Sequence, residues 1–316
     1  MLKSKSRQNQ NDKARTKVAI LGSGNIGTDL LIKIMRSQYL RCSFFIGRKL
    51  GSGGMARAIN LGVRISDHSV EAIVDEPDCC DIVFDCTSSE THKRHWTILE
   101  KLGKRVIDLT PAKVGRLCIP SVNMEECLTE PNINMVSCGG QTAIPLAYVL
   151  GQTQQHVEYI EVVSTIASLS AGPATRLDID EYIHTTELGL KTFSGCQQTK
   201  AILNLNPAEP PIDMQTTVFA KVGSPDMERL HFAVTNMVEK IRKYVPGYQI
   251  IVPPTDGNNR ISIMVKVRGI GDYLQKYAGN LDIINCAAVY AAEEFAKDGL
   301  RSRVRGTASD KCDESS

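Results

Sequence analysis

The first half of the chain alternates between short apolar runs and segments of helical periodicity. The apolar runs fall at residues 17–22, 41–47, 80–89, 105–112 and 133–138. Between them, segments such as 28–37 place leucine, isoleucine and methionine at helical spacing. Because strands separated by helices usually pair in parallel, this half predicts an α/β fold with a Rossmann-type doubly wound parallel sheet.

The pattern changes after Cys138. A strand-like segment at 158–168, a helix-like segment at 178–195 and an alternating segment at 261–269 follow without strict alternation of strand and helix. Alternation of apolar and polar positions at 261–269 predicts antiparallel strands with one solvent face. The second half therefore predicts an α+β catalytic domain.

A long amphipathic helix over 279–297 is expected to complete the first domain. The predicted dinucleotide-binding domain comprises residues 17–137 and 275–298, and the predicted catalytic and dimerisation domain comprises residues 138–274. The ends, residues 1–16 and 299–316, contain too few apolar residues to predict folded structure, so we expect disordered tails there.

Length, charge and cysteine content narrow the class of protein. The 316 residues suit two modest domains, and a net charge of +2 gives no reason to expect nucleic acid or an acidic membrane as partner. No apolar run approaches the roughly 20 residues that cross a bilayer, and the basic N-terminus lacks the apolar core of a secretory signal. Ten cysteines without C-x-x-C spacing indicate reduced thiols in a cytoplasmic protein. We expect small molecules or other proteins as partners.

A glycine motif between the first strand and the first helix predicts a dinucleotide site. The first glycine allows a tight turn, the second lets a pyrophosphate approach the backbone, and the third lets the helix pack on the strand. The N–H groups at the start of the helix then face the phosphate. The alternative is a plain glycine turn. The G-x-G-x-x-G motif comprises Gly22, Ser23, Gly24, Asn25, Ile26 and Gly27.

The end of the second predicted strand carries a positive charge instead of a negative one. An acidic residue normally binds the ribose hydroxyl about 20 residues after the glycine motif. Arg48 occupies that position here, and no Asp or Glu occurs between Leu30 and Ser66. Since an arginine can accept a 2′-phosphate, the sequence allows NADP as well as NAD. The alternative is a solvated basic surface.

Cys138 is the candidate nucleophile. It follows a buried strand and precedes two glycines that open a helix. Helix N–H groups and the helix dipole stabilise a thiolate, so we expect a lowered pKa for this thiol. A thiolate can attack an aldehyde, pass a hydride to a nicotinamide and retain the acyl group as a thioester, while backbone N–H groups of the turn hold the oxyanion. The alternative is a small buried apolar side chain.

Several long stretches of the sequence resemble one family, the acylating acetaldehyde dehydrogenases. Members of this family partner a hydroxy-oxo-acid aldolase in the meta-cleavage pathways of aromatic hydrocarbon catabolism. The similarity extends from about Lys17 to about Ala296. It is carried by KVAILGSGNIGTDLLIK, DIVFDCTSS, VIDLTPA, NMVSCGGQTAIP, LSAGPATRLDIDEY, NPAEPP and YAGNLDII.

The resemblance implies that acetaldehyde or another short aldehyde is oxidised with NAD and coenzyme A to an acyl-CoA. It also implies an aldolase partner. We further expect a homodimer or larger assembly, and no metal. The acyl-thioester cysteine falls on Cys138, and the first NAD contact falls on Ser23 to Ile26. The remaining NAD contacts that the resemblance implies are Leu169, Ser170, Ala171, Gly172, Pro173, Ala174, Thr175, Arg176, Leu177 and Asn280.

Two positions depart from the family pattern. Family members usually carry Asp where this chain has Arg48, and an Asp that assists proton transfer where this chain has Thr216. General acid–base help is typically worth about 10²–10⁴-fold in rate. The chain is therefore expected to be slower, to act on another acyl group or to use another base, and Asp213 is near in sequence.

Two other functions stay open on the sequence alone. One is a phosphate-using dehydrogenase of the semialdehyde type, and the other is a nucleotide-binding paralogue that has lost turnover.

The pair His92 and His95 has H-x-x-H spacing, but with no further ligand suggested we expect a solvated helix face and no zinc. Acidic residues at 178, 180 and 181 suit the start of a helix, and we assign them no catalysis.

Overall fold

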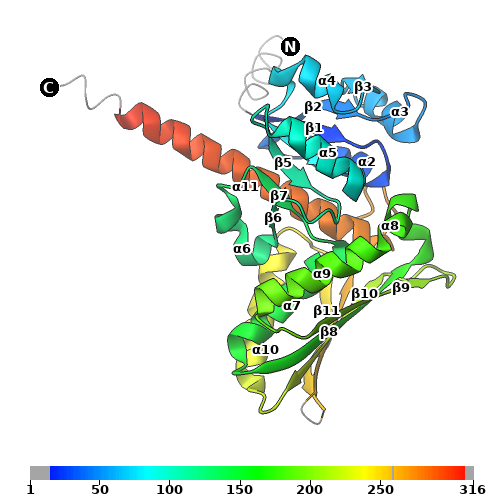
Figure 1. Cartoon of the computed structure of the whole chain (residues 1–316). Helices are drawn as coiled ribbons and strands as arrows, with labels where there is room; N and C mark the ends of the chain where they lie inside the picture. Colours follow the sequence, from blue (N-terminus) through cyan, green and yellow to red (C-terminus); the bar gives the residue numbers. More distant parts are fainter. Residues whose placement is uncertain (1–14, 258–259, 310–316) are drawn as a thin grey trace, which may run out of the picture.

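Figure 1 shows a chain built around two β-sheets, each with its own helical cover. The computed structural model describes residues 15–257 and 260–309, without the side chains of residues 173–174 and 302–309. The sequence predictions for residues 1–14 and 310–316 lie outside the described residues.

The first sheet has seven strands in the order β3-β2-β1-β4-β5-β7-β6, and all its pairs are parallel. The predicted Rossmann-type doubly wound sheet is therefore confirmed. Because β1 lies between β2 and β4, the crevice for a ligand is expected at the carboxyl ends of these strands. The strands are β1 (Thr16–Leu21), β2 (Leu40–Ile46), β3 (Ile65–Ser66), β4 (Ile82–Asp85), β5 (Arg105–Asp108), β6 (Arg116–Leu117) and β7 (Asn132–Asn134).

Helices cover both faces of this sheet. Leu30 and Ile34 of α2 join Ala288 of α11 in one core, and Ile73 of α4 joins Leu99 of α5 in the other. The stretches 18–21 of β1 and 82–84 of β4 are continuously apolar because both faces of these strands are buried. The helical elements of this region are α2 (Asn25–Met35), α3 (Gly53–Asn60), α4 (Glu71–Asp75), η1 (Pro77–Cys79), α5 (Ser89–Leu99) and α6 (Pro120–Cys127).

The second sheet has five strands in the order β11-β12-β10-β8-β9. The pair β8 and β9 is parallel, and the other pairs are antiparallel, as predicted for 261–269. Helices α7, α9 and α10 cover one face, and their apolar side chains form a core with the strands. The strands are β8 (Val157–Ala167), β9 (Thr199–Asn206), β10 (Met214–Val222), β11 (Tyr248–Asp256) and β12 (Arg260–Val267), and the helical elements are α7 (Cys138–Thr153), η2 (Ser168–Ser170), α8 (Pro173–Leu177), α9 (Ile179–Ser194) and α10 (Met227–Arg242).

The final helix, α11 (Gly279–Ser309), returns to the first sheet (Figure 1). The prediction of a structureless tail from residue 299 is wrong, because this helix continues to Ser309. Arginine has a good helix propensity, and extending an existing helix needs no new nucleus, so low apolar content does not end it. None of the helices among the described residues is long and apolar enough to span a membrane.

A buried lysine ties α2 to α11 and to the loop that precedes it. Lys33 Nζ lies 2.7 Å from Asp282, and 3.1 Å from each of Asp29 and Asp272. All four side chains are at most 7% exposed. This cluster fixes the start of α11 against the helix that follows the glycine motif.

Candidate active site

The glycine motif forms the turn that its spacing predicts. Gly22 has a φ of +117°, and a Cβ there would lie 2.7 Å from the Cys86 carbonyl oxygen. A Cβ on Gly27 would lie 1.9 Å from the Gly22 oxygen, so helix and strand pack too closely for any side chain. A Cβ on Gly24 would meet nothing within 4 Å. This open backbone is where a phosphate can approach.

A groove of about 1260 Å³ runs along the carboxyl ends of β1, β2 and β4. Gly22 and Gly24 form one end of its lining, and exposed Arg48 lines it just beyond β2. Leu177 and Asp178 close it from the second domain. The groove has the position and size of a dinucleotide site, with a fixed positive charge where a ribose 2′-position would lie.

The other residues of the motif have separate places. Ser23 Oγ accepts a hydrogen bond from Ser52 at 3.1 Å, which ties the turn to the start of α3. Asn25 is the exposed first residue of α2. Ile26, one residue further, faces away from the groove into a second pocket.

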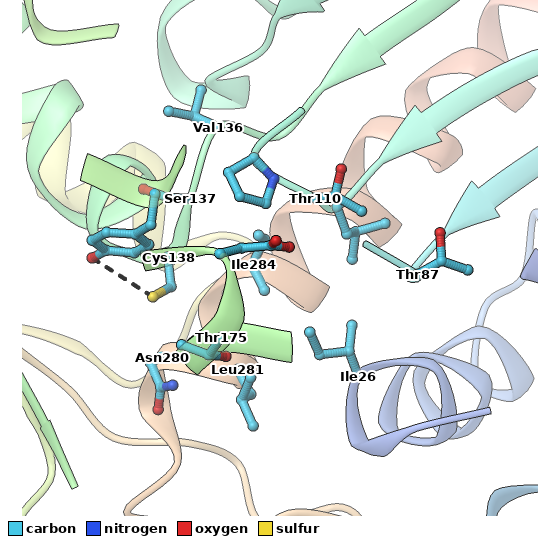
Figure 2. Close-up of a pocket in the computed structure, with 14 residues that line it drawn as sticks. Ile26, Thr87, Thr110, Val136, Ser137, Cys138, Thr175, Asn280, Leu281 and Ile284 are labelled. Carbon is cyan, nitrogen blue, oxygen red and sulfur yellow. Dashed lines mark hydrogen bonds between the residues drawn. The ribbon is translucent and has the colours of Figure 1, made fainter. Parts of the chain in front are cut away.

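This second pocket holds about 580 Å³ of empty space and meets the groove at Thr87 and Asp178. Figure 2 shows Cys138, Thr175 and Asn280 gathered on one side, with Ile26 of α2 opposite them. The lining comes from both domains. It comprises Ile26, Thr87, Leu109, Thr110, Pro111, Val136, Ser137, Cys138, Thr175, Asp178, Tyr182, Asn280, Leu281 and Ile284.

Cys138 is the first residue of α7 and is held by a rigid turn. Val136 has a φ of +64°, a conformation that is strained for a β-branched residue, and its N–H donates to Asn134 Oδ1 at 2.8 Å. Ser137 caps the helix by accepting a hydrogen bond from the Gly140 N–H at 2.8 Å. Strain at a turn that is fixed by its neighbours is frequent at functional sites.

The predicted lowering of the Cys138 pKa is wrong. Burial raises the pKa of this thiol to about 11, although hydrogen bonds from Tyr182 and from the Gly139 N–H act in the opposite direction. The helix start alone does not compensate for the loss of water around the sulfur. At neutral pH the resting side chain is therefore a thiol.

Tyr182 of α9 contacts Cys138 through its hydroxyl. Its Oη lies 3.9 Å from Cys138 Sγ, and Figure 2 marks this contact by a dashed line. The side chain is buried, and burial raises its pKa well above the usual value. Tyr182 is not among the residues predicted from the sequence, because nothing in a lone tyrosine on a helix indicates where tertiary packing will place it.

Thr216 lies inside the second domain and not at the pocket surface. It is fully buried on β10, opposite Ser164 of β8, and the two hydroxyls are 3.0 Å apart. Asp213, the alternative base, lies 3.9 Å from Lys266 and is not part of the pocket lining. Asp178 does line the pocket; its carboxylate accepts a hydrogen bond from the Ser89 N–H at 3.4 Å.

The 169–177 segment reaches both cavities through only part of its length. Thr175 lines the pocket and Leu177 lines the groove, whereas Leu169 is exposed and Ser170 is buried against the Ala167 carbonyl. Arg176 bonds the carbonyl oxygens of Ser168 and Ala171, so its charge holds the loop together. Gly172 and Ala171 lie in the same loop, outside both linings. Pro173 and Ala174 belong to α8, and their side chains lie outside the described part of the structure.

Asn280 is the second residue of α11 and is 1% exposed. Within the described part of the chain, its Oδ1 accepts no hydrogen bond, although the residue lines the pocket. A buried acceptor without a donor is costly unless a ligand supplies one. The carboxamide of a nicotinamide has such a donor, so this residue fits the cofactor that the first domain predicts.

A buried charge network supports the pocket wall at the ends of β4 and β5. Asp85 accepts hydrogen bonds from the Thr87 hydroxyl, from His92 at 3.0 Å and from His95 at 2.8 Å. The prediction of a solvated face for these histidines is wrong, since they are 0% and 4% exposed. The charged residues Lys93 and Arg94 stand between the two histidines in sequence and suggest a solvent-exposed face. The histidines, three residues apart, lie on the opposite, buried side of α5.

Asp108 completes this network on the next strand. Its carboxylate accepts hydrogen bonds from the Thr110 N–H at 2.8 Å and from Asn134 at 2.6 Å, and His92 Nε2 lies 3.4 Å away. Burial raises the pKa of Asp108 to about 7. The Asp-x-Thr pattern, which occurs at 85–87 and again at 108–110, is the feature of the sequence that could have predicted this network. In such a pattern the Asp side chain accepts a hydrogen bond from the N–H of the residue two positions later.

Comparison with known proteins agrees with both halves of this architecture. Residues 17–129 match the family model described as semialdehyde dehydrogenase, NAD binding domain. Residues 138–275 match the one described as prokaryotic acetaldehyde dehydrogenase, dimerisation.

Relatives and a solved structure are similar to this chain over most of its length. An acetaldehyde dehydrogenase of Spirochaeta aurantia is 61% identical over 280 residues, 89% of this chain and 94% of that protein. One of Pectobacterium atrosepticum is 58% identical over 287 residues, 90% of this chain and 96% of that protein. Aspartate semialdehyde dehydrogenase II of Vibrio cholerae shares the fold, with a TM-score of 0.61 at 15% identity over 90% of this chain and 99% of that one.

The chain joins a Rossmann-type sheet to a second mixed sheet, and its relatives at 58% and 61% identity define the class as a nicotinamide-dependent aldehyde dehydrogenase. Within this class, the chain belongs to the acetaldehyde dehydrogenase family, whose members are NAD-dependent oxidoreductases.

Proposed function

We propose that the protein oxidises acetaldehyde, or a similar short aldehyde, with NAD and coenzyme A to the corresponding acyl-CoA. The observation that carries this proposal is the position of Cys138 in a pocket that also contains Ile26 of the dinucleotide helix and Asn280. A nucleophile and a hydride acceptor must meet at one carbon for this chemistry.

In the proposed reaction, Cys138 adds to the aldehyde carbonyl and forms a thiohemiacetal. NAD, when bound, supplies the hydride acceptor. Loss of a hydride from the carbon and of the hydroxyl proton to water leaves an acyl thioester on Cys138. Cys138 then releases the acyl group to coenzyme A and takes up the proton of the coenzyme A thiol. The apolar side chains of Leu109, Val136, Leu281 and Ile284 suit a short alkyl group.

The proposed cofactor contacts follow from the same geometry. The turn from Ser23 to Ile26 holds the pyrophosphate, and Thr175 and Asn280 face the nicotinamide end. We further propose that Arg48 lets NADP bind as well as NAD, since its guanidinium lines the groove beyond β2.

The test is nicotinamide reduction by purified protein given acetaldehyde, coenzyme A and either NAD or NADP. A Cys138→Ser variant removes the nucleophile, and Cys42→Ser provides a matched control at a partly buried cysteine outside the pocket. We expect CoA-dependent reduction that only Cys138→Ser abolishes. Reduction that requires phosphate instead of coenzyme A would move the protein to the semialdehyde type of reaction.

The assembly is part of the same proposal. The second sheet has helices on one face, and the positions of β10 that point to its other face are partly exposed. We propose that this face pairs two copies of the chain as a homodimer or part of a larger assembly, which light scattering can test. An aldolase partner, and a place in aromatic catabolism, depend on the family resemblance and are tested by co-purification with such an aldolase.

A further inference from the structure

The proposed reaction needs a group that moves protons beside Cys138, and no carboxylate contacts this sulfur within the described residues. The family position for an acidic residue is Thr216, which is buried against Ser164. Asp213 lies 3.9 Å from Lys266, outside the pocket lining. Asp178 lines the pocket, but its described hydrogen bond goes to the Ser89 N–H. The Tyr182 hydroxyl, which can both give and take a proton, lies 3.9 Å from Cys138 Sγ.

The surroundings of Tyr182 fix its hydroxyl at one point. The Ser164 side chain and the Gly139 backbone lie beside Oη, and hydrogen bonding with them lowers the pKa of Tyr182, against the larger effect of burial. A Cβ on Gly139 would lie 2.1 Å from Oη and 3.1 Å from Ser164 Oγ, so the hydroxyl fills the space that only a glycine leaves. These contacts hold the phenol oxygen at a fixed position, which a proton transfer requires.

Thr216 affects which way the hydrogen bonds around Ser164 can run. Ser164 Oγ lies 3.0 Å from Thr216 Oγ1, and a threonine hydroxyl can donate to it, which a carboxylate cannot do. When Thr216 donates in this pair, Ser164 keeps its own proton for a hydrogen bond to Tyr182. The phenol proton is in turn available to the pocket, where the substrate carbonyl would lie.

We propose that Tyr182 is a catalytic residue that exchanges protons with Cys138 and the aldehyde during thiohemiacetal formation, an inference that depends on the proposed function. The Cys138 S–H bond breaks as the C–S bond forms, and the thiol proton passes to Tyr182 Oη. The Tyr182 O–H bond breaks at the same time, and its proton passes to the carbonyl oxygen. Both groups are neutral before the step, and Tyr182 is neutral after it, so this addition step requires no other base.

The test compares Tyr182→Phe with Tyr248→Phe in the full-length protein. Tyr248 is also fully buried, and its hydroxyl donates to the Thr142 carbonyl at 2.7 Å, away from the pocket. The two variants therefore lose one buried hydroxyl each. We expect Tyr182→Phe to lower kcat/KM for CoA-dependent aldehyde oxidation by about 10²-fold or more, the lower end of general acid–base effects. Tyr248→Phe should stay within a few-fold of the original protein.

A pH profile separates this role from a structural one. Because burial raises the pKa of Cys138 to about 11, more of the thiol ionises unaided as the pH is raised from 7 to 10. The deficit of Tyr182→Phe should shrink over this range, whereas a variant with a distorted pocket would keep its deficit. Equal binding of NAD by both variants, measured by calorimetry, confirms that the nucleotide site is intact.

Each remaining outcome has a definite meaning. If Tyr182→Phe is as active as Tyr248→Phe while Cys138→Ser is inactive, the proposed function stands and the role of Tyr182 is refuted. A deficit confined to Asp178→Asn would also refute it and would assign proton transfer to that carboxylate. If the unmodified protein binds NAD but shows no CoA-dependent oxidation of short aldehydes, the proposed function itself fails, and the role of Tyr182 fails with it.

Discussion

Replacing Lys33 by Met should destabilise the protein strongly, because one buried cation serves three buried carboxylates. The Nζ lies 2.7 Å from Asp282 and 3.1 Å from both Asp29 and Asp272. Asp272 keeps Arg36 at 2.6 Å in the variant, and Asp29 keeps a hydrogen bond from Asn285 at 2.8 Å. Asp282 is left without a cation among the described residues.

The size of the effect follows from this loss of one partner. At an effective dielectric constant of about 20, a charge pair at 3 Å is worth roughly 5 kcal/mol before desolvation is counted. Removing one member of a buried ion pair typically costs about 3–5 kcal/mol of unfolding free energy. We expect a loss in that range for Lys33→Met at pH 7.5. Lys240→Met, at an exposed lysine of α10, should change the free energy by about 0.5 kcal/mol at most.

The pH dependence of this loss has a definite sign. In the variant, the uncompensated Asp282 carboxylate has a folded pKa above its unfolded value, so its contribution to stability is present at low pH and lost as the pH rises. The pKa of Lys33 in the original protein is raised, so its own contribution stays constant between pH 5 and 8. The difference between the two proteins should therefore shrink from pH 7.5 to pH 5.

Equilibrium unfolding in guanidinium chloride at both pH values measures these free energies. A loss below about 1 kcal/mol at pH 7.5 would refute the assignment of Lys33 as the stabilising cation. A loss of equal size at both pH values would refute the electrostatic explanation and favour a packing defect.

Three further perturbations test other parts of the site. Gly139→Ala should lower the rate of aldehyde oxidation at least as much as Tyr182→Phe, because the new Cβ would lie 2.1 Å from Tyr182 Oη and displace it. The NAD affinity measured by calorimetry should not change. Retained activity would show that the phenol can move. Arg48→Asp should lower the NADP-to-NAD ratio of kcat/KM by roughly 10-fold or more, the value of one charge-assisted hydrogen bond; an unchanged ratio would make Arg48 a surface charge. Burial raises the pKa of Asp108 to about 7, so between pH 4 and 7 the native state binds a proton that the unfolded state has lost. Relative to Asp108→Asn, the unfolding free energy should fall by up to about 1.4 kcal/mol per pH unit as the pH rises through this window; parallel curves from denaturant titrations would contradict this.

The parts of the site that the sequence predicts correctly are those with local geometry. The glycine motif specifies its own turn, since Gly22 needs a positive φ and Gly27 needs the absence of a side chain. Cys138 follows a buried strand and opens a helix, so its position at the carboxyl edge of the sheet also follows from neighbours in sequence. The apolar periodicities of 28–37 and 261–269 predict their elements for the same reason.

The parts that the sequence does not predict depend on packing between distant segments. Tyr182 is 44 residues from Cys138, and only the packing of α9 against α7 brings them together. The pKa of Cys138 depends on how completely that packing excludes water, which a helix start does not reveal. His92 becomes a buried ion-pair partner because β4 and β5 place two carboxylates beside it.

The path of the chain has a consequence for how the protein is made. Helix α11 supplies Ala287, Ala288, Ala291 and Phe295 to the core beneath the first sheet, and it is synthesised after the whole second sheet. During translation, we therefore expect the nucleotide domain to keep an open apolar face until α11 has been synthesised. Asn280 belongs to that helix, so the pocket around Cys138 is completed only after α11 is made. A nascent chain thus contains Cys138 well before it contains every residue that lines the pocket.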